Sequence, residues 1–266
     1  LRAASRADGF ENALHLQLFE QNALLKGEQE KRLGHYSPYW ASEIDAVGGD
    51  PLFVVANEFF DALPINQAVK QPDGWHECTI CVDDDGSLAH IVGPYVLAHF
   101  ERTLPDDLRE AETDAIFEWR GGQSIFEIGR RVARHNGAAL VIDYGHAPSA
   151  CGDTLQAVSQ HAYADPLVSP GLVDITAHVD FQALGILAES IGAVVQGPVS
   201  QQDFLMRVGI ERRAASLKAK ATVAQAEAID SAMRRLIGAG PDDMGRLFKV
   251  MALAHPKLGA LPGFND

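Results

Sequence analysis

The amino-acid sequence predicts an α/β fold built on a mainly parallel β-sheet. Strand-like segments alternate along the chain with helix-like segments, which is typical of parallel strands joined by helical crossovers. Two of the strand-like segments, 51–56 and 138–143, are continuous apolar runs, as expected of strands covered on both faces. Polar residues follow three of the strands, and ligands of such folds gather at the carboxyl ends of strands. We therefore expect the functional site at those ends.

The first elements follow from local patterns. Residues 15–20 alternate polar and apolar side chains and predict a strand that ends at Glu20. Residues 22–32 are polar and compatible with a helix, which Gly34 closes. Residues 65–92 contain short strand-like runs separated by turn signals, and therefore predict an antiparallel meander.

The second half of the chain is expected to continue the alternation. Apolar side chains at helical spacing predict helices, and apolar runs predict strands. The helices are expected over 124–136, 180–191 and most of 201–237, and the strands over 138–143, 193–196 and 247–254. Residues 144–179 show little periodicity and predict a long loop, and loops of that length inside a compact domain are usually either functional or disordered. We expect one domain, 1–266, with a β-meander insertion at 65–120 and a helical insertion at 201–240.

Composition restricts the partners. The 266-residue chain has 36 acidic and 22 basic residues, a net charge of −14, which repels nucleic acid and anionic membrane surfaces. No window approaches the roughly 18 consecutive apolar residues of a membrane span, and no signal peptide is visible. Three cysteines argue against a disulfide framework and for a reducing compartment. These features predict a protein of a bacterial-type cytoplasm.

The segment from Asn57 to Pro64 carries the strongest chemical signal. An apolar strand runs into Glu58, two aromatic residues and a second acid, Asp61. If the chain turns helical there, the i, i+3 spacing places both carboxylates on one face. Paired carboxylates beside aromatic rings suit a guanidinium, which they bind in bidentate fashion. The alternative is a helix N-terminus at which the dipole favours acids.

Three further features have competing explanations. Glu20, one residue past a strand, can accept hydrogen bonds from both hydroxyls of a ribose, or can simply face water. Cys78 and Cys81 form a single pair in an extended segment, so we expect no metal site. Ser124 lacks the strand and closing glycine of a nucleophile elbow, which argues against a serine hydrolase.

The motif Ala56-Asn-Glu-Phe-Phe-Asp-Ala-Leu-Pro64 resembles the signature of the MidA family of methyltransferases, which includes a mitochondrial complex I assembly factor. The likeness continues in order along nearly the whole chain, at residues 74–77, 117–120, 137–146, 152–154, 174–181 and 244–248. The resemblance implies a class I methyltransferase (Rossmann-like) fold and S-adenosyl-L-methionine as cofactor. It also implies a protein arginine side chain as methyl acceptor, with a subunit of respiratory complex I as one candidate partner. A homodimer is left open.

The resemblance also implies roles for individual residues. Glu58 and Asp61 are expected to be catalytic, and Glu20 and Asn57 to bind the cofactor. The substrate is expected to meet the residues Phe59, Phe60, Asp143, Tyr144 and His161. For His161, a role as a hydrogen-bonded loop anchor is slightly favoured over a role in the reaction.

One departure from the family pattern is large. Family members carry a Glu-x-Gly-x-Gly-x-Gly loop, and a strand before it, ahead of the helix that residues 1–3 would finish. We expect both to be missing here, so that this chain alone binds S-adenosyl-L-methionine poorly. The glycines of 238–245 follow a helix and predict an interhelical turn instead. Two other functions stay open: a non-enzymatic assembly protein with a methyltransferase fold, and a nicotinamide-dependent dehydrogenase.

Overall fold

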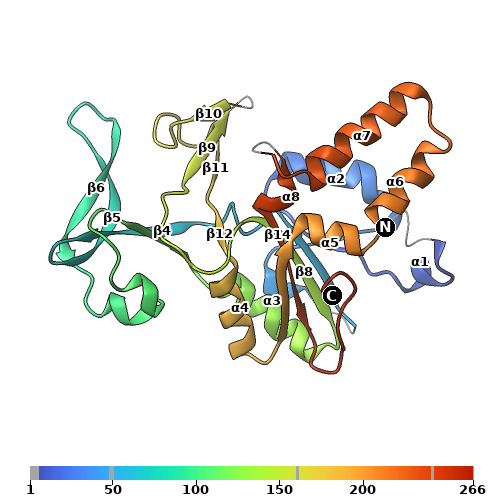
Figure 1. Ribbon diagram of the computed structural model, residues 1–266, viewed down its shortest axis with the longest axis horizontal. Coiled ribbons are helices and arrows are strands. Elements are labelled where there is room, and N and C mark those ends of the chain that lie inside the picture. The colour runs from blue at the N-terminus through green and yellow to red at the C-terminus, as the bar shows by residue number, and fades with distance from the viewer. Residues whose placement is uncertain (1–5, 48–50, 160–161, 241–242, 266) are drawn as a thin grey trace.

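The computed structural model describes residues 6–47, 51–159, 162–240 and 243–265. Figure 1 shows a body that contains the central sheet, a second sheet that projects from one side of it, and a small flap between them. Three helices, α5 (Gln201–Arg207), α6 (Ile210–Lys218) and α7 (Val223–Ile237), lie on the side of the body away from the projecting sheet. These three helices confirm the predicted helical insertion.

The central sheet is mixed. Its strands are β3 (Phe53–Asn57), β8 (Ala138–His146), β12 (Val179–Asp180), β13 (Val194–Ser200) and β14 (Phe248–Ala254). Strands β3 and β12 run parallel to β8, whereas β14 lies antiparallel between β8 and β13. This arrangement confirms the predicted α/β sheet and brings the ends of β3 and β8 together.

The core lies between the central sheet and two helices, α3 (Gln123–Arg134) and α4 (Phe181–Ser190). Helix α3 buries Ile125, Ile128 and Val132, which follow one another at helical spacing. Asp180 caps α4, since its side chain accepts the backbone N–H of Ala183. Both helices were predicted from this periodicity, and the structure confirms them.

A second, two-stranded unit precedes the central sheet. Strands β1 (Gln17–Phe19) and β2 (Tyr39–Ala41) pair in parallel and are joined by helix α2 (Ala23–Leu33). Asn22 caps α2 by accepting the N–H groups of Leu24 and Leu25. Within the described residues, β1 and β2 form no hydrogen-bonded ladder with the central sheet.

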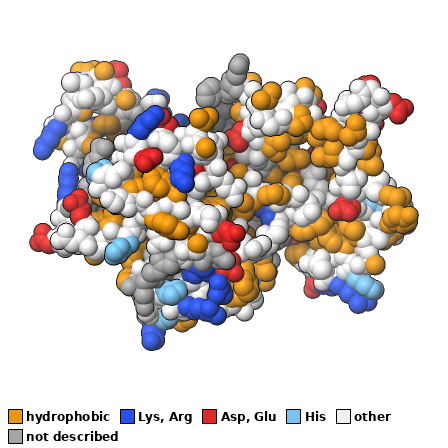
Figure 2. All heavy atoms as spheres, turned by 180° about the vertical axis from the view of Figure 1, so that it is seen from behind, with side chains coloured by type: hydrophobic (Ala, Val, Ile, Leu, Met, Phe, Trp, Pro, Cys, Tyr) orange, Lys and Arg blue, Asp and Glu red, His pale blue; other side chains and the backbone are white. Residues whose placement is uncertain are grey.

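The projecting sheet is the predicted meander. Strands β4 (Ile65–Gln71), β5 (Gly74–Val82), β6 (Leu88–Val96) and β7 (Ile116–Arg120) are all antiparallel, in the order β6-β5-β4-β7. Its own core holds Ala68, Trp75, Leu104 and Phe117. Apolar side chains also gather on its outer surface (Figure 2), and they include Ile80, Val82, Ile91, Val92, Tyr95 and Val96.

Short elements complete the chain. They are the helices α1 (Phe10–Ala13) and α8 (Met244–Leu247) and the 3-10 turns Gly34–Tyr36, Ile44–Ala46, Phe100–Thr103 and Asp106–Leu108. The backbone N–H of Gly245 donates to the carbonyl of Gly238, so the described part of 238–245 is a turn between helices, as predicted.

Two expectations were wrong. Residues 144–179 were expected to be a loop, but they contain a small sheet of β9 (Gln156–Ser159), β10 (Ala162–Ala164) and β11 (Asp174–Thr176), which is the flap of Figure 1. Its strands are too short to show a periodicity. Strand β3 was expected to be covered on both faces. Instead Phe53 and Val55 are 73% and 72% exposed, because β3 is buried only on the face of Ala56.

Gly145 allows β12 to pair closely with β8. A Cβ there would lie 2.0 Å from the carbonyl oxygen of Val179, a backbone atom that cannot turn away. We expect Gly145→Ala to lower the free energy of unfolding by about 1–3 kcal/mol in urea denaturation. Gly27→Ala is the control, because a Cβ on that helical residue meets nothing within 4 Å; it should raise stability by up to about 1 kcal/mol. Equal effects of the two substitutions would contradict the close pairing.

Candidate functional site

Asp143 is the centre of a buried polar network at the carboxyl ends of β3 and β8. Its Oδ2 accepts the backbone N–H groups of Phe59, Phe60 and Asp61 at 3.2, 3.0 and 3.2 Å. Its Oδ1 accepts the N–H of Tyr144 at 3.0 Å. The side chain is completely buried. The carboxylate therefore fixes the Asn57–Pro64 segment to the end of β8.

Asp61 is fixed by both its backbone and its side chain. Its Oδ2 accepts the phenol of Tyr144 at 2.7 Å, and its carbonyl oxygen accepts the N–H of Ala177 at 3.1 Å. Its Oδ1 is buried and has no hydrogen-bond partner among the described residues. The Tyr144 phenol also hydrogen-bonds Thr176 of β11. The flap is thereby attached to the same network.

Two charged side chains of β7 enter this network from the projecting sheet. Arg120 donates to the carbonyl oxygens of His178 at 2.6 Å, Ala177 at 2.5 Å and Asp61 at 3.3 Å. Glu118 accepts the backbone N–H and the hydroxyl of Thr154, and the Thr154 hydroxyl in turn accepts the N–H of His178. The two residues alternate with Phe117 and Trp119, so they lie on one face of the strand.

Burial and charge shift the pKa values within the network. Burial raises the pKa of Asp143 to about 7, the charge of Asp61 adds to the rise, and the backbone N–H groups oppose it. Burial also raises the pKa of Tyr144 above its usual value and lowers the pKa of His178. Perturbed titratable groups that share one environment are typical of functional sites.

Glu58 behaves differently from Asp61. It adopts a left-handed conformation with φ 47°, which is uncommon outside glycine, and its side chain is exposed. Its N–H donates to the carbonyl of Ile142 at 2.9 Å, and its Oε1 accepts the side-chain N–H of Asn57 at 3.1 Å. The expectation of a helical turn with both carboxylates on one face was therefore wrong. Asp143 takes the N–H groups that such a turn would use, and Glu58 points out while Asp61 points in.

The aromatic residues of the segment divide in the same way. Phe60 is 1% exposed and belongs to the core of the central sheet, so its ring is not accessible to a ligand. Phe59 is half-buried and packs edge-to-face on Phe19 of β1, with ring centres 6.0 Å apart. Asn57 is exposed at the end of β3. His161 lies outside the described residues.

Glu20 lies at the end of β1, beside a hollow of about 220 Å³. Its Oε1 accepts the N–H of Asn22 at 2.8 Å and its Oε2 accepts Gln29 Nε2 at 3.2 Å. The hollow is lined by the ends of β1 and β2 and the start of α3, namely Phe19, Gln21, Ser42, Glu43, Ile44, Gln123, Ser124 and Glu127. Local sequence patterns did not indicate this set, because it comes from three separate segments.

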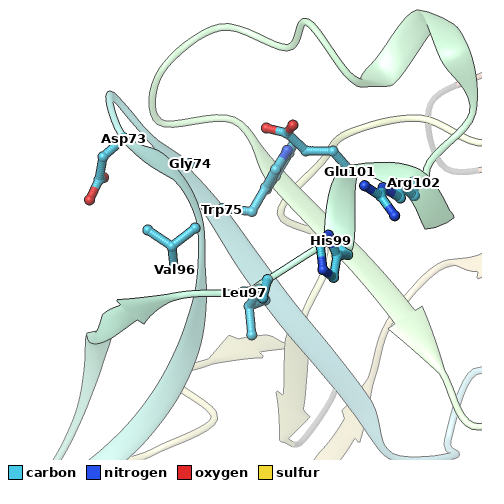
Figure 3. A pocket seen from close by; sticks show the side chains of 9 residues that line it. Asp73, Gly74, Trp75, Val96, Leu97, His99, Glu101 and Arg102 are labelled. Atoms are coloured by element: carbon cyan, nitrogen blue, oxygen red, sulfur yellow. The ribbon is translucent and has the colours of Figure 1, made fainter.

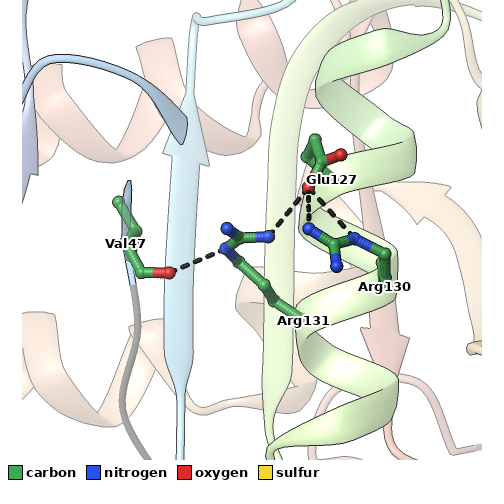
Figure 4. Close-up of polar contacts among 4 residues, drawn as sticks. All are labelled: Val47, Glu127, Arg130 and Arg131. Atoms are coloured by element: carbon green, nitrogen blue, oxygen red, sulfur yellow. Dashed lines mark hydrogen bonds and ion pairs between the residues drawn. The ribbon is translucent and has the colours of Figure 1, made fainter. Parts of the chain in front are cut away.

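The wall of this hollow is held in place by helix α3 (Figure 4). Glu127 accepts hydrogen bonds from Arg130 at 2.6 Å and from Arg131 at 2.8 Å, and Arg131 also donates to the carbonyl of Val47 at 2.7 Å. The segment after β2 is thus fastened to α3. The network keeps the ends of β1 and β2 facing the start of that helix.

A larger hollow of about 280 Å³ lies in the projecting sheet, away from the carboxyl ends of β3 and β8 (Figure 3). Trp75 forms part of its wall, and Lys70 lies over the Trp75 ring and pairs with Glu101 at 2.7 Å. Trp75 Nε1 is buried without a partner among the described residues. No residue of the Asp143 network lines this hollow, so we do not include it in the candidate site.

The described residues contain no group of three or more His, Cys, Asp or Glu side chains that could hold a metal ion, and the three cysteines are free thiols. No helix in the described ranges is both long and apolar enough to cross a membrane.

Comparisons with known proteins agree with this geometry. A family model described as "Putative S-adenosyl-L-methionine-dependent methyltransferase" matches residues 1–199. The mitochondrial protein arginine methyltransferase NDUFAF7 of Mus musculus is 34% identical over 227 residues, which are 82% of this chain and 50% of that protein. The Caenorhabditis elegans homolog is 33% identical over 219 residues, 81% and 50% of the two chains. This chain spans about half the length of the curated relatives it matches.

Solved structures extend the likeness to the fold. A COG1565 superfamily protein from Burkholderia thailandensis has a TM-score of 0.80 and 28% identity, covering 94% of this chain and 68% of its own. A second structure of a COG1565 superfamily member from the same organism, bound to S-adenosyl-homocysteine, has a TM-score of 0.78 and 28% identity, covering 94% of this chain and 66% of its own. These confirm the predicted methyltransferase fold class. The curated relatives are named as mitochondrial, so the expected bacterial-type cytoplasm stays a prediction.

The pKa of Asp143 has a measurable consequence. The folded pKa of about 7 lies above the usual aspartic acid pKa of 3.8, so between these pH values the folded state holds a proton that the unfolded state has lost. The contribution of Asp143 to the free energy of unfolding is therefore fully present below pH 3.8 and decreases as the pH rises to about 7. In Asp143→Asn this dependence disappears, and an amide N–H group faces backbone N–H groups, at a cost of about 1–3 kcal/mol. In denaturation experiments, the stability advantage of the wild type should shrink as pH rises across this range. An advantage that grows with pH would show that Asp143 is charged throughout.

Proposed function

Because the chain belongs to the family of S-adenosyl-L-methionine-dependent methyltransferases whose model it matches over residues 1–199, we propose that it carries the acceptor side of a methyl-transfer site. The acceptor that we propose is an arginine side chain of a protein. A subunit of respiratory complex I is one candidate, since the curated relatives are named as protein arginine methyltransferases and the family resemblance includes a complex I assembly factor.

The exposed carboxylate of Glu58 carries this proposal. A non-glycine residue with φ 47° stores strain of about 1–3 kcal/mol, which persists only where the surroundings enforce it. Here the hydrogen bonds of Asp143 enforce the conformation of the next three residues. The Glu58 carboxylate therefore points away from the sheet at the carboxyl end of β3, where ligands of this fold class bind.

The residues at the ends of β1 and β2 fit the nucleoside half of the cofactor. Each oxygen of Glu20 accepts one hydrogen bond, and a carboxylate offers about four acceptor positions. Acceptors therefore remain for two ribose hydroxyls. The hollow beside Phe19 offers an apolar and polar lining for the base. Asn57, at the end of β3, is the residue that we propose to contact the cofactor from the acceptor side.

We propose the following roles in the reaction. S-adenosyl-L-methionine, when bound, would supply an electrophilic methyl group for a guanidinium nitrogen and would leave as S-adenosyl-homocysteine. Glu58 binds the N–H groups of the guanidinium, orients the attacking nitrogen and takes up the proton that this nitrogen releases. The half-buried ring of Phe59 offers a surface on which the guanidinium plane can stack. Asp61 contributes from inside the network, because its buried Oδ1, which has no partner among the described residues, can accept a hydrogen bond.

The remaining predicted residues support rather than contact the acceptor. Asp143 is completely buried and holds the segment that bears Glu58. Tyr144 holds Asp61, and Phe60 anchors the segment in the core. Most of the catalytic gain in such a reaction comes from orientation, which can supply about 7–11 kcal/mol. A rigid segment is therefore the main contribution of these residues.

Glu58→Gln tests the proposal in the full-length protein. The amide cannot accept the proton and binds a guanidinium poorly, so methyl transfer from labelled S-adenosyl-L-methionine to arginine-containing peptides should fall by about 100-fold or more. Affinity for S-adenosyl-homocysteine, measured by calorimetry, should change little. Glu112→Gln, at an exposed acid of the projecting sheet, is the matched control and should keep full activity.

Two results would refute the assignment. Unchanged turnover in Glu58→Gln would remove Glu58 from the reaction. A wild-type protein that binds S-adenosyl-homocysteine but methylates no arginine-containing substrate would favour the non-enzymatic assembly function instead.

A further inference from the structure

Arg120 belongs to one sheet but makes its contacts in another part of the molecule. It is the last residue of β7 in the projecting sheet, and its guanidinium bridges the turn after β11 to the Asn57–Pro64 segment. Two of its acceptors, Ala177 and His178, are adjacent, and the third is Asp61. A planar guanidinium can serve several fixed acceptors at once, which a lysine ammonium on a flexible stem cannot do with the same geometry.

The contact with Asp61 completes the immobilisation of that residue. The Asp61 N–H donates to Asp143, the carbonyl accepts both Arg120 and the N–H of Ala177, and Oδ2 accepts Tyr144. Of its polar atoms, Oδ1 alone has no partner in the described part of the chain. Asp61 is separated from Glu58 by only two residues, both of which bind Asp143. Its position therefore sets that of Glu58.

We propose that Arg120 is a positioning residue for methyl transfer, which couples the projecting sheet to the carboxylates of the Asn57–Pro64 segment. This inference rests on the proposed function. Arg120 joins β7 to Asp61 and to the turn after β11. Glu118 on the same face of β7 fastens the Thr154 loop to the same turn, so the coupling has a second attachment.

A purely structural Arg120 would act on stability alone. The distinguishing experiment compares Arg120→Lys with Arg235→Lys in the full-length protein. Both changes keep the positive charge, but Arg235 is exposed on α7, outside the Asp143 network and not among the residues that line the hollow beside Phe19. Steady-state kinetics are measured with labelled S-adenosyl-L-methionine and an arginine-containing peptide, well below the unfolding temperature of each variant.

We expect kcat of Arg120→Lys to fall by about 10–100-fold, because small displacements of reacting groups cost that much. The KM values for cofactor and peptide should change by less than about three-fold, since Glu58 and the hollow remain. Arg235→Lys should retain the wild-type kcat. An unchanged kcat in Arg120→Lys, with or without lower stability, would overturn the proposal.

Amide hydrogen exchange provides a readout that does not depend on the reaction. In Arg120→Lys, the N–H groups of Phe59, Phe60 and Asp61 should exchange at least about ten-fold faster than in Arg235→Lys, because their segment opens more easily. If the wild type transfers no methyl group, the proposed function fails while this measurement still tests the coupling. Equal exchange in the two variants would overturn it.

Discussion

The carboxylate of Asp143 is the contact on which the rest of the site depends. Three consecutive N–H groups of the segment after β3 converge on one of its oxygens, although Asp143 lies more than eighty positions further along the chain. A buried carboxylate is costly unless such donors surround it, and buried N–H groups are costly unless an acceptor meets them. Each side of the contact therefore requires the other. This mutual requirement holds Glu58 in a left-handed conformation and directs its side chain out of the sheet.

Much of the fold was predictable because its signals are local. Apolar side chains at helical spacing identified α3 and α4, turn signals identified the meander, and an apolar run identified β8. The strands of the flap were missed because three or four residues cannot display a period. The exposure of Phe53 and Val55 was missed because an apolar run shows that a strand is compatible with burial, but not which neighbours cover it.

The candidate site was predictable in its location but not in its geometry. Strand ends with polar residues led to Glu20, Glu58 and Asp143. Glu20 and Glu58 directly follow β1 and β3, whereas Asp143 lies inside β8, which continues to His146. Spacing alone paired Glu58 with Asp61 on one helical face, and that pairing failed because a distant carboxylate takes the N–H groups of the segment. Arg120 had no local signal that separated it from a surface charge. The family resemblance includes residues 117–120, and the alternation of Glu118 and Arg120 with aromatic residues on one strand indicated that both face a common environment.

The unsatisfied atoms of the network bear on its purpose. Asp61 Oδ1 and Arg120 Nε are both buried without partners among the described residues, although Arg120 and Asp61 are already joined by another hydrogen bond. Each such atom costs about 1–3 kcal/mol, which a fold selected for stability alone would have little reason to retain. A substrate N–H group could donate to the Asp61 acceptor, and a shift of the Asn57–Pro64 segment during the reaction could bring an acceptor to the Arg120 donor. Departures from full hydrogen bonding tend to lie at functional sites. Two of the three buried, unsatisfied side-chain atoms of the described residues belong to this network, and the third, Trp75 Nε1, lies in the projecting sheet. The cost in stability and the proposed position of the acceptor thus have one physical origin.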